Sequence, residues 1–158
     1  MDVIAHRGAS AERPENTLAA FERALAIGVD GIETDVLLTK EGRLVARHDD
    51  LIEAVGGRHD VRELTFSELQ EIDVGDGQRI PPIEMVLERL AGRCPLVLDV
   101  KCSGVAPVLA GLLKVLGIAA GVHVASFLHQ ELTQMGRLAP GVARSLTFPG
   151  SGRPARLS

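Results

Sequence analysis

Residues 3–49 read VIAHRGASAERPENTLAAFERALAIGVDGIETDVLLTKEGRLVARHD, and this stretch decides the fold. Short apolar runs alternate in it with a segment whose apolar residues recur at helical spacing. Side chains that suit metal and phosphate chemistry stand at the ends of the apolar runs. The pattern predicts strands and helices in alternation, and therefore parallel strands joined by helical crossovers.

The rest of the chain continues this alternation. Apolar runs predict six strands, at residues 3–5, 31–37, 44–47, 96–100, 122–127 and 143–148. Helices are predicted to begin near Thr17, Thr65 and Pro82, and to cover residues 105–116 and 128–138. Residues 51–60 hold two adjacent glycines and show no clear period, so a loop is expected there. Residues 150–158 are predicted to form a disordered tail.

Two architectures fit the alternation, a doubly wound open sheet and a β/α barrel. The polar residues distinguish them, because they lie on or just after at least four of the strands, and a barrel gathers these strand ends around one mouth. No GxGxxG or phosphate-binding glycine loop follows the first strand. We therefore expect an α/β protein whose residues 1–149 form a TIM-type β/α barrel. The barrel is expected to be incomplete, with about six of the eight strands that a complete one needs.

Composition sets further bounds. With 158 residues, 46 % of them hydrophobic and 24 % charged, the chain fits one soluble domain with a core. A net charge of −4 and the lack of a basic block argue against nucleic-acid binding. No leader sequence or membrane-spanning apolar run is visible, so we expect a cytoplasmic protein that does not insert into membranes. Cys94 and Cys102 lack the spacing of metal ligands and are expected to be small buried side chains.

Carboxylates are the first candidates for chemistry. Glu33 and Asp35 lie two residues apart on a predicted strand, so both point to the same face. The negative charges of two such carboxylates repel each other unless a cation lies between them. Carboxylate oxygens are suitable ligands for Mg²⁺ or Ca²⁺. Asp99 and Lys101 repeat the spacing, and would add a third ligand and a positive charge for phosphate binding or charge balance. The alternative for Glu33 and Asp35 is a polar layer inside the barrel whose charges are satisfied by lysine or water. The alternative for Asp99 and Lys101 is an ordinary internal ion pair.

Two histidines flank these carboxylates. His6 ends the first predicted strand and His48 ends the third. A lone histidine at a strand end is more often structural, but a pair beside a carboxylate cluster suits a general base and a general acid. Asp49 would either support His48 or serve only as a turn residue.

Arg7 and the residues before the first helix complete the candidate site. The guanidinium of Arg7 can hold two phosphate oxygens at once, or it can form a salt bridge at the rim. Glu15 would orient Arg7 or reach the metal site through water. Asn16 or Thr17 would cap the helix that follows.

These residues together resemble the signature of the glycerophosphodiester phosphodiesterase family. The resemblance rests on His-Arg-Gly at 6–8, Glu-Asn-Thr at 15–17, GVDGIETDV at 28–36 and His-Asp at 48–49. It continues through LTFSELQEI, IPPIEMVLERL and LVLDVK, and covers about residues 3–127. It implies a β/α barrel that hydrolyses glycerophosphodiesters to glycerol 3-phosphate and an alcohol, with a divalent metal. The family's last two strands have no counterpart in this chain.

The resemblance also implies roles for single residues: catalysis for His6 and His48, phosphate binding for Arg7 and Lys101, and metal ligation for Glu33, Asp35 and Asp99. Glu15, Asn16 and Asp49 are expected to support them. Asp99 stands where the family usually has a glutamate, which is one methylene longer. The family commonly has His-Asp-Pro where this chain has His-Asp-Asp, at residues 48–50.

The expected function is therefore metal-dependent hydrolysis of glycerophosphodiesters, with Mg²⁺ or Ca²⁺ and general acid and base catalysis by histidine. Two alternatives stay open. One is a phospholipase D-like enzyme that acts on lipid head groups, and the other is an inactive remnant that binds metal or phosphate. An incomplete barrel would expose the edges of its first and last strands, so a homodimer that pairs these edges is a further expectation.

Overall fold

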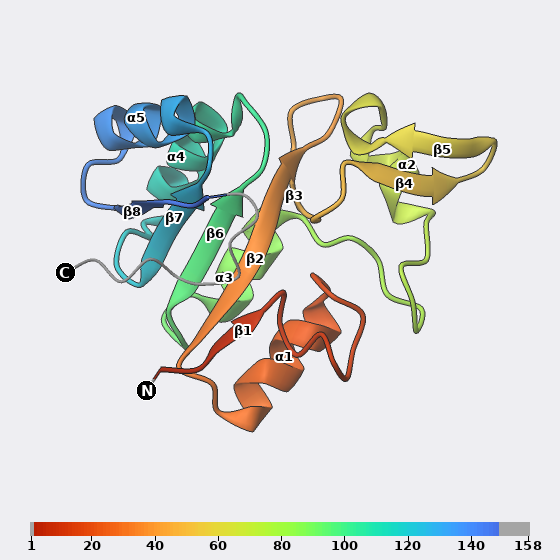
Figure 1. Cartoon of the computed structure of the whole chain (residues 1–158), viewed down its shortest axis with the longest axis horizontal. Coiled ribbons are helices and arrows are strands. Elements are labelled where there is room, and N and C mark those ends of the chain that lie inside the picture. The colour runs from red at the N-terminus through yellow and green to blue at the C-terminus, as the bar shows by residue number, and fades with distance from the viewer. Residues whose placement is uncertain (1, 149–158) are drawn as a thin grey trace.

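One six-stranded sheet forms the centre of the fold (Figure 1). The computed structural model describes residues 2–148, so the tail expected at 150–158 lies outside the described residues. The strands run in the order β1–β2–β6–β7–β8, all parallel, and β3 pairs with β2 outside this path. Their bounds are β1 (Ile4–His6), β2 (Gly31–Leu38), β3 (Leu44–Ala46), β6 (Leu96–Val100), β7 (Val122–Ser126) and β8 (Ala143–Leu146).

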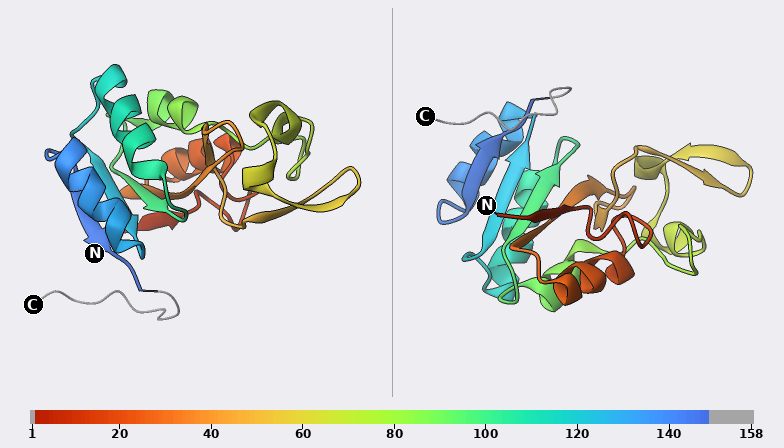
Figure 2. Two further views of the ribbon diagram at one scale, coloured as in Figure 1. Left: turned by 90° about the horizontal axis from the view of Figure 1, so that it is seen from above. Right: turned by 60° about the horizontal axis from the view of Figure 1, so that its bottom comes forward.

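Helices cover one side of this curved sheet (Figures 1 and 2). They are α1 (Leu18–Ile27), α3 (Ile83–Leu90), α4 (Val105–Leu116) and α5 (His129–Leu138). Alternate residues of the central strands pack in the core, and Ile32, Leu98 and Val124 have no exposed surface. Burial of these apolar side chains is the main driving force for folding. The residues between them point to the opposite face of the sheet, which carries the polar side chains.

The start of α1 follows from its sequence. Thr17 is the N-cap, because its Oγ1 accepts a hydrogen bond from the Ala20 N–H at 3.2 Å. Gly28 ends the helix with a φ of 85°, a left-handed conformation that glycine adopts without a steric penalty. Phe21 lies on the buried face of the helix between these ends.

Removing the cap tests this local interaction. We expect Thr17→Ala to lower the free energy of unfolding by about 1 kcal/mol, because one helix N–H loses its partner. Urea denaturation followed by circular dichroism measures the change. Thr17→Ser keeps the hydroxyl and is expected to stay close to the parent chain. Equal stability of Thr17→Ala and the parent would show that the cap contributes nothing.

The direction of β3 corrects the prediction of parallel strands. β3 follows β2 after a short turn and runs antiparallel to it, with Val36 opposite Ala46. A connection of this length cannot hold a crossover, which takes a dozen or more residues. The reversal leads the chain back along β2, where the Arg47 N–H donates to the Asp35 carbonyl at 3.2 Å. His48 therefore reaches the level of Asp35, although its strand runs the other way.

A hairpin replaces the loop expected at residues 51–60, so that prediction is wrong. β4 (Leu51–Ala54) and β5 (Gly57–Asp60) pair antiparallel to each other. The adjacent glycines form the turn, with φ of 91° at Gly56 and 120° at Gly57. Strands of four residues are too short for a period to show in the sequence. The hairpin, η1 (Val61–Glu63) and α2 (Phe66–Gln70) project beyond the sheet (Figure 1).

The sheet is open within residues 2–148, with β1 at one edge and β8 at the other. The homodimer expected to pair these edges stays a prediction. Cys94 and Cys102 are both free thiols, and burial raises the pKa of each. Among the helices of the described residues, none combines the length and the apolar character that a bilayer span requires.

Candidate metal and phosphate site

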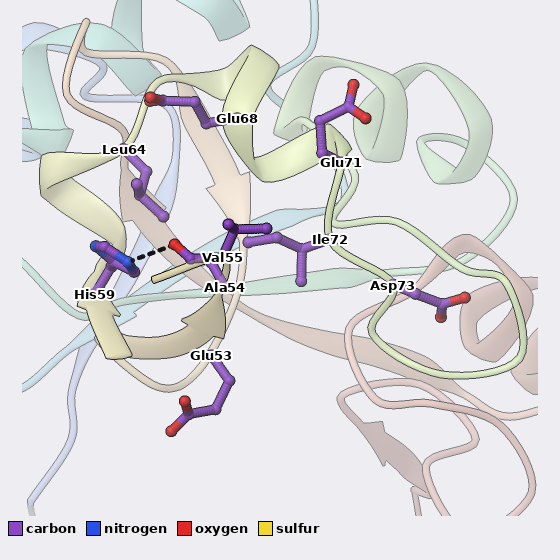
Figure 3. Close-up of a pocket in the computed structure, with 9 residues that line it drawn as sticks. All are labelled: Glu53, Ala54, Val55, His59, Leu64, Glu68, Glu71, Ile72 and Asp73. Carbon is purple, nitrogen blue, oxygen red and sulfur yellow. Dashed lines mark hydrogen bonds between the residues drawn. The ribbon is translucent and has the colours of Figure 1, made fainter. Parts of the chain in front are cut away.

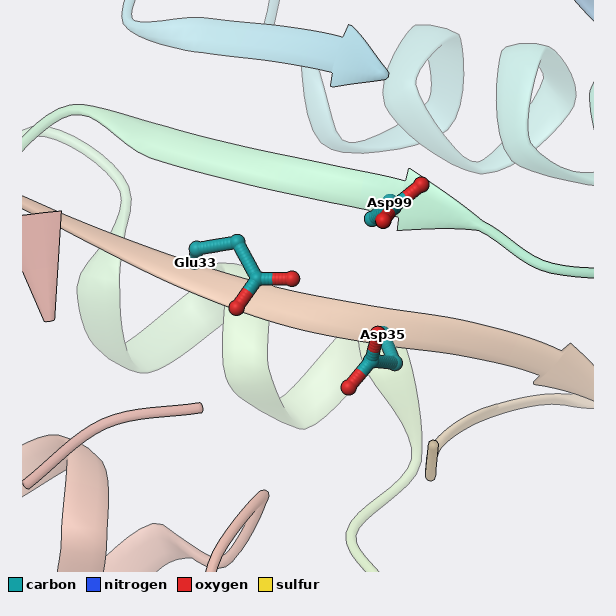
Figure 4. Close-up of side chains that lie close together, drawn as sticks. All are labelled: Glu33, Asp35 and Asp99. Atoms are coloured by element: carbon teal, nitrogen blue, oxygen red, sulfur yellow. The ribbon is translucent and has the colours of Figure 1, made fainter. Parts of the chain in front are cut away.

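Three carboxylates converge on the polar face of the sheet (Figure 4). Asp35 of β2 lies directly opposite Asp99 of β6 in the strand register, and Glu33 precedes Asp35 by two residues on the same face. Each of the three side chains offers one oxygen, and these oxygens all lie within 4.8 Å of one another. The sheet register, together with the alternation along β2, therefore produces the cluster.

The surroundings of this cluster suit a cation. The side chains of Glu33 and Asp35 are only 12 % and 0 % exposed, and Asp99 is 15 % exposed. Burial raises the pKa of Glu33 to about 7, and the neighbouring charge of Asp35 adds to the rise. The Oδ1 atoms of Asp35 and Asp99 are buried without a hydrogen bond among the described residues. Hard oxygen atoms left unsatisfied in this way are appropriate ligands for Mg²⁺ or Ca²⁺.

Lys101 partly balances the cluster. Its Nζ lies 2.5 Å from Asp99 Oδ2 and donates to it. It also lies 3.1 Å from Asp35 Oδ1, a distance that allows ionic attraction although the groups are not aligned for a hydrogen bond. Burial alone lowers the pKa of Lys101, but the hydrogen bond to Asp99 and the charge of Asp35 outweigh it and leave the pKa raised. Lys101 therefore carries its charge at neutral pH.

Arg7 approaches Asp35 from the other side. Its Nε lies 3.2 Å from Asp35 Oδ2, and its Nη1 donates to both carboxylate oxygens of Glu15, at 3.1 and 3.0 Å. The backbone N–H of Arg7 also donates to Glu33 Oε2 at 3.0 Å. Of the two roles considered for Glu15, contact with Arg7 is the one present. Two nitrogen atoms of the guanidinium, Nε and Nη1, thus contact carboxylates and hold the group in place.

Asn16 is a buried support for Asp35 rather than a helix cap. Its Nδ2 donates to Asp35 Oδ2 at 2.9 Å, and its Oδ1 accepts from Thr34 Oγ1 at 2.8 Å and from the Asp35 N–H at 3.3 Å. Along one edge of β2, the pairing with β1 ends at Glu33 and the pairing with β3 starts at Val36. The Asn16 amide therefore fills the gap between the two neighbouring strands, where Asp35 N–H would otherwise lack a partner.

The loop after β1 reaches this position through left-handed backbone. Arg7 and Asn16 have φ of 59° and 55°, and the Asn16 N–H donates to the Arg7 carbonyl at 3.0 Å. Gly8 has a φ of 78°, and a Cβ on it would lie 2.8 Å from the backbone carbonyl carbon of Ala20. Only glycine fits such a close approach, which explains the third residue of His-Arg-Gly. Two non-glycine residues in this conformation mark stored strain, which is typical of functional sites.

His6 lies at the edge of the carboxylate cluster. It stands opposite Glu33 in the register of β1 and β2, and its Nε2 is 3.8 Å from Glu33 Oε2. Partial burial and the charge of Arg7 lower the pKa of His6 from its ordinary value. Most of the ring is exposed. His6 therefore favours the neutral form near pH 7 and can exchange protons with a bound molecule.

His48 is oriented by Asp49. Its Nδ1 lies 2.8 Å from Asp49 Oδ1, and this hydrogen bond lowers the pKa of the Asp49 carboxyl. An ionised carboxylate only accepts hydrogen bonds, so the contact favours the tautomer with the proton on Nδ1. The Nε2 atom of neutral His48 is then free to accept a proton. Of the two roles considered for Asp49, contact with His48 is the one present.

A cavity of about 420 Å³ adjoins the cluster. Three of the expected site residues line it, namely His48, Asp99 and Lys101. The others are Asp50, Phe127, Thr147 and Phe148. Sequence reasoning did not combine these four into a site, although two signals were present: the second aspartate of His-Asp-Asp, and Phe127 at the end of the predicted strand 122–127, where the family resemblance also ends. His6 does not line this cavity.

A larger cavity, of about 550 Å³, lies elsewhere, between the β4–β5 hairpin and α2 (Figure 3). Its wall includes Val55, Leu64 and Ile72, with Glu53 and Glu71 among its polar residues. None of the predicted site residues lines it. The smaller cavity is therefore the one that adjoins the predicted site residues.

Comparison with known proteins identifies the family. The model of the glycerophosphoryl diester phosphodiesterase family matches residues 6–141. A glycerophosphodiester phosphodiesterase of Caldanaerobacter subterraneus is 36 % identical over 160 residues, which cover 92 % of this chain and 66 % of that protein. A putative glycerophosphodiester phosphodiesterase of Bacillus subtilis is 34 % identical over 99 % of this chain and 70 % of its own length.

Solved structures give the same result for the fold. A glycerophosphodiester phosphodiesterase from Agrobacterium tumefaciens superposes with a TM-score of 0.82 and 31 % identity, over 91 % of this chain and 65 % of that one. A phosphodiesterase from Oleispira antarctica, in complex with the product sn-glycerol-3-phosphate, has a TM-score of 0.83 at 28 % identity, over 92 % and 65 % of the two chains. This chain thus spans about two thirds of the length of its relatives, and the expected incomplete β/α barrel is confirmed. The chain belongs to the glycerophosphoryl diester phosphodiesterase family.

Proposed function

We propose that this protein hydrolyses glycerophosphodiesters to glycerol 3-phosphate and an alcohol, and that it uses Mg²⁺ or Ca²⁺ held by Glu33, Asp35 and Asp99. The observation that carries the proposal is the convergence of these three carboxylates within 4.8 Å in a chain of this family. The product complex of the Oleispira antarctica phosphodiesterase supports the substrate class. The bound cation would polarise a phosphoryl oxygen and stabilise the negative charge that develops there.

The cationic side chains bind the same phosphate. Glu15 and Asp35 hold Arg7 through Nη1 and Nε, so its Nη2 stays available to a phosphate oxygen. Lys101 lines the cavity beside Asp99 and adds a second positive charge. Both charges are in place before substrate binds, so they stabilise the transition state without a cost of reorganisation.

The two imidazoles carry the protons. Asp49 holds His48 with Nε2 free, so His48 removes a proton from the attacking oxygen or, once protonated, donates one to the leaving alcohol. His6, whose Nε2 lies 3.8 Å from Glu33 Oε2, performs the complementary transfer. In-line displacement of an alcohol requires one group that accepts a proton from the attacking oxygen and a second group that donates a proton to the leaving alcohol.

A direct assay tests the proposal. The purified chain is incubated with glycerophosphocholine, and glycerol 3-phosphate is measured with a coupled dehydrogenase. We expect release of glycerol 3-phosphate that falls on addition of EDTA and returns with excess Mg²⁺ or Ca²⁺. Calorimetric titration with the same ions is expected to show binding that Asp35→Asn removes.

Two outcomes would contradict the proposal. Metal uptake without any release of glycerol 3-phosphate would identify an inactive remnant that only binds metal. Release that is insensitive to EDTA would exclude the metal from the reaction. Glu53→Gln, which removes an exposed carboxylate outside the site, is the matched control and is expected to leave both readouts unchanged.

A further inference from the structure

The cavity between the β4–β5 hairpin and α2, which we call the hairpin cavity, has an apolar wall (Figure 3). Ala54, Val55, Leu64 and Ile72 form this wall. Val55 is 100 % exposed, so its side chain is in full contact with water. The volume of about 550 Å³ falls within the range of small-molecule pockets, about 300 to 1,000 Å³. Covering this apolar surface with a ligand would be favourable, because it removes the surface from water.

Carboxylates surround the apolar wall. Glu53 belongs to β4, whereas Glu68, Glu71 and Asp73 belong to α2 and the segment that follows it. In the view of Figure 3, the apolar side chains lie between Glu53 on one side and Glu68 and Glu71 on the other. Within residues 2–148, no lysine or arginine lines the cavity. The cavity therefore presents negative charge on two sides of an apolar surface.

The protein's own cations balance these carboxylates only weakly. Arg58 Nε lies 3.7 Å from Glu53 Oε1, and Arg79 Nη1 lies 3.5 Å from Asp73 Oδ2, with both pairs largely exposed to water. Exposed ion pairs of this kind contribute little. Glu71 also lines the cavity, and its carboxylate forms no hydrogen bond or ion pair within residues 2–148. A cationic ligand can therefore approach these groups without displacing a strong internal partner.

The spacing of the carboxylates disfavours a metal ion in this cavity. Mg²⁺ and Ca²⁺ need several oxygens around one point, at about 2.0 to 2.6 Å. Among the described residues, Glu33, Asp35 and Asp99 converge closely enough for this, and no such group lines the hairpin cavity. Separate negative charges with apolar surface between them are complementary to a cation whose own charges are separated by methylene groups.

We propose that the hairpin cavity binds an aliphatic polyamine. Its methylene groups lie on Val55, Leu64 and Ile72, and its ammonium groups lie at the carboxylates of Glu53 and Glu71. The ammonium groups stay partly in water at the rim, so the cost of desolvating a charge is small. The methylene chain covers apolar surface in the way that the stem of a lysine side chain does.

This site goes beyond the proposed function, because none of the residues proposed for hydrolysis lines the hairpin cavity. A lysine-rich peptide would bring similar charges, but it would also have to remove backbone amides from water. The apolar side chains of the wall offer these amides no hydrogen-bond partner, and an unpaired buried amide is costly. The cavity therefore favours the polyamine over the peptide.

Titration of the full chain with spermidine tests the proposal. Binding is followed by NMR of the methyl groups, in a buffer free of divalent metal and of chelator. The neutral comparison is octane-1,8-diol, which has the same chain length. We expect spermidine to shift the methyl resonances of Val55, Leu64 and Ile72, and the diol to bind at least about fivefold more weakly. Raising NaCl from about 50 to about 300 mM should weaken spermidine binding, because the ion pairs are exposed.

Variants locate the site. Glu53→Gln and Glu71→Gln are each expected to weaken spermidine binding about two- to fivefold, the size of one exposed ion pair. Val55→Thr keeps the shape of the side chain and replaces a methyl group by a hydroxyl, and it should have an effect of about the same size. Glu63→Gln is the matched control and should leave binding unchanged, because Glu63 is exposed on η1 and does not line the cavity.

Three results would overturn the proposal. Equal binding of spermidine and octane-1,8-diol would show that the carboxylates play no part. Binding that Asp35→Asn removes, and that Glu53→Gln and Glu71→Gln leave unchanged, would place the cation at the carboxylates of β2 and β6 instead. Tighter binding of a blocked lysine peptide of the same charge would identify a peptide site. None of these measurements depends on turnover, so failure of the proposed function would leave the polyamine site standing, and the reverse also holds.

Discussion

Replacing His48 by glutamine is expected to lower kcat/KM for glycerophosphocholine by about 10²- to 10⁴-fold, the usual contribution of a general acid or base. His48 lines the cavity beside Asp99 and Lys101, and Asp49 fixes its ring through Nδ1 at 2.8 Å. Glutamine preserves much of the size and polarity but cannot exchange a proton near neutral pH. His6→Gln is expected to cause a loss in the same range. The coupled assay for glycerol 3-phosphate measures both.

Two comparisons make this prediction specific. His123 forms a hydrogen bond with Ser145 and lies near the start of β7, two strands away from Glu33 in the register, so His123→Gln is the matched control and should retain activity. The double variant of His6 and His48 should lose less than the product of the two single effects, because the histidines act as a unit. A folded His48→Gln variant with near-normal kcat/KM would remove His48 from the mechanism.

The central sheet and its carboxylates were predictable from the sequence. Apolar alternation marks β2 and β6 as strands, and the period of two places Glu33 and Asp35 on one face. That Asp99 lies directly opposite Asp35 depends on the strand register, which the sequence does not state. Both strands are buried on the helix side, and burial of one face specifies register strongly, so the two aspartates meet.

Other parts of the site depend on contacts far apart in the chain. The reversal at β3 follows from the short turn at residues 39–43, but the position to which it brings His48 depends on the contact of the Arg47 N–H with the Asp35 carbonyl. Asn16 looks like a helix cap in the sequence, since Asn is a preferred cap residue. Its amide instead fills the gap along β2, a role that requires the end of β1 and the start of β3 to be placed first. A local sequence pattern cannot identify a hydrogen-bond partner that only the tertiary structure brings close.

Glu33 is expected to make the stability of the metal-free protein depend on pH. Its carboxyl has a pKa of about 7 in the folded chain against an ordinary 4.5, because burial and the charge of Asp35 both raise it. Folding therefore favours the protonated carboxyl. The stability that this group contributes is complete below pH 4.5, and it is lost as the pH rises through 7. The difference between the two pKa values corresponds to about 3 kcal/mol.

A comparison with Glu33→Gln isolates this contribution, because glutamine resembles the protonated carboxyl and does not titrate. In EDTA, the free energy of unfolding of the parent relative to Glu33→Gln is expected to fall by about 3 kcal/mol between about pH 4 and about pH 8, measured by urea denaturation. Excess Mg²⁺ or Ca²⁺ should remove most of the fall in the parent, since a cation between the carboxylates favours the charged form of Glu33. A constant difference between the parent and Glu33→Gln across this range would mean that the carboxylates do not strain one another, and the physical case for a cation among them would fail.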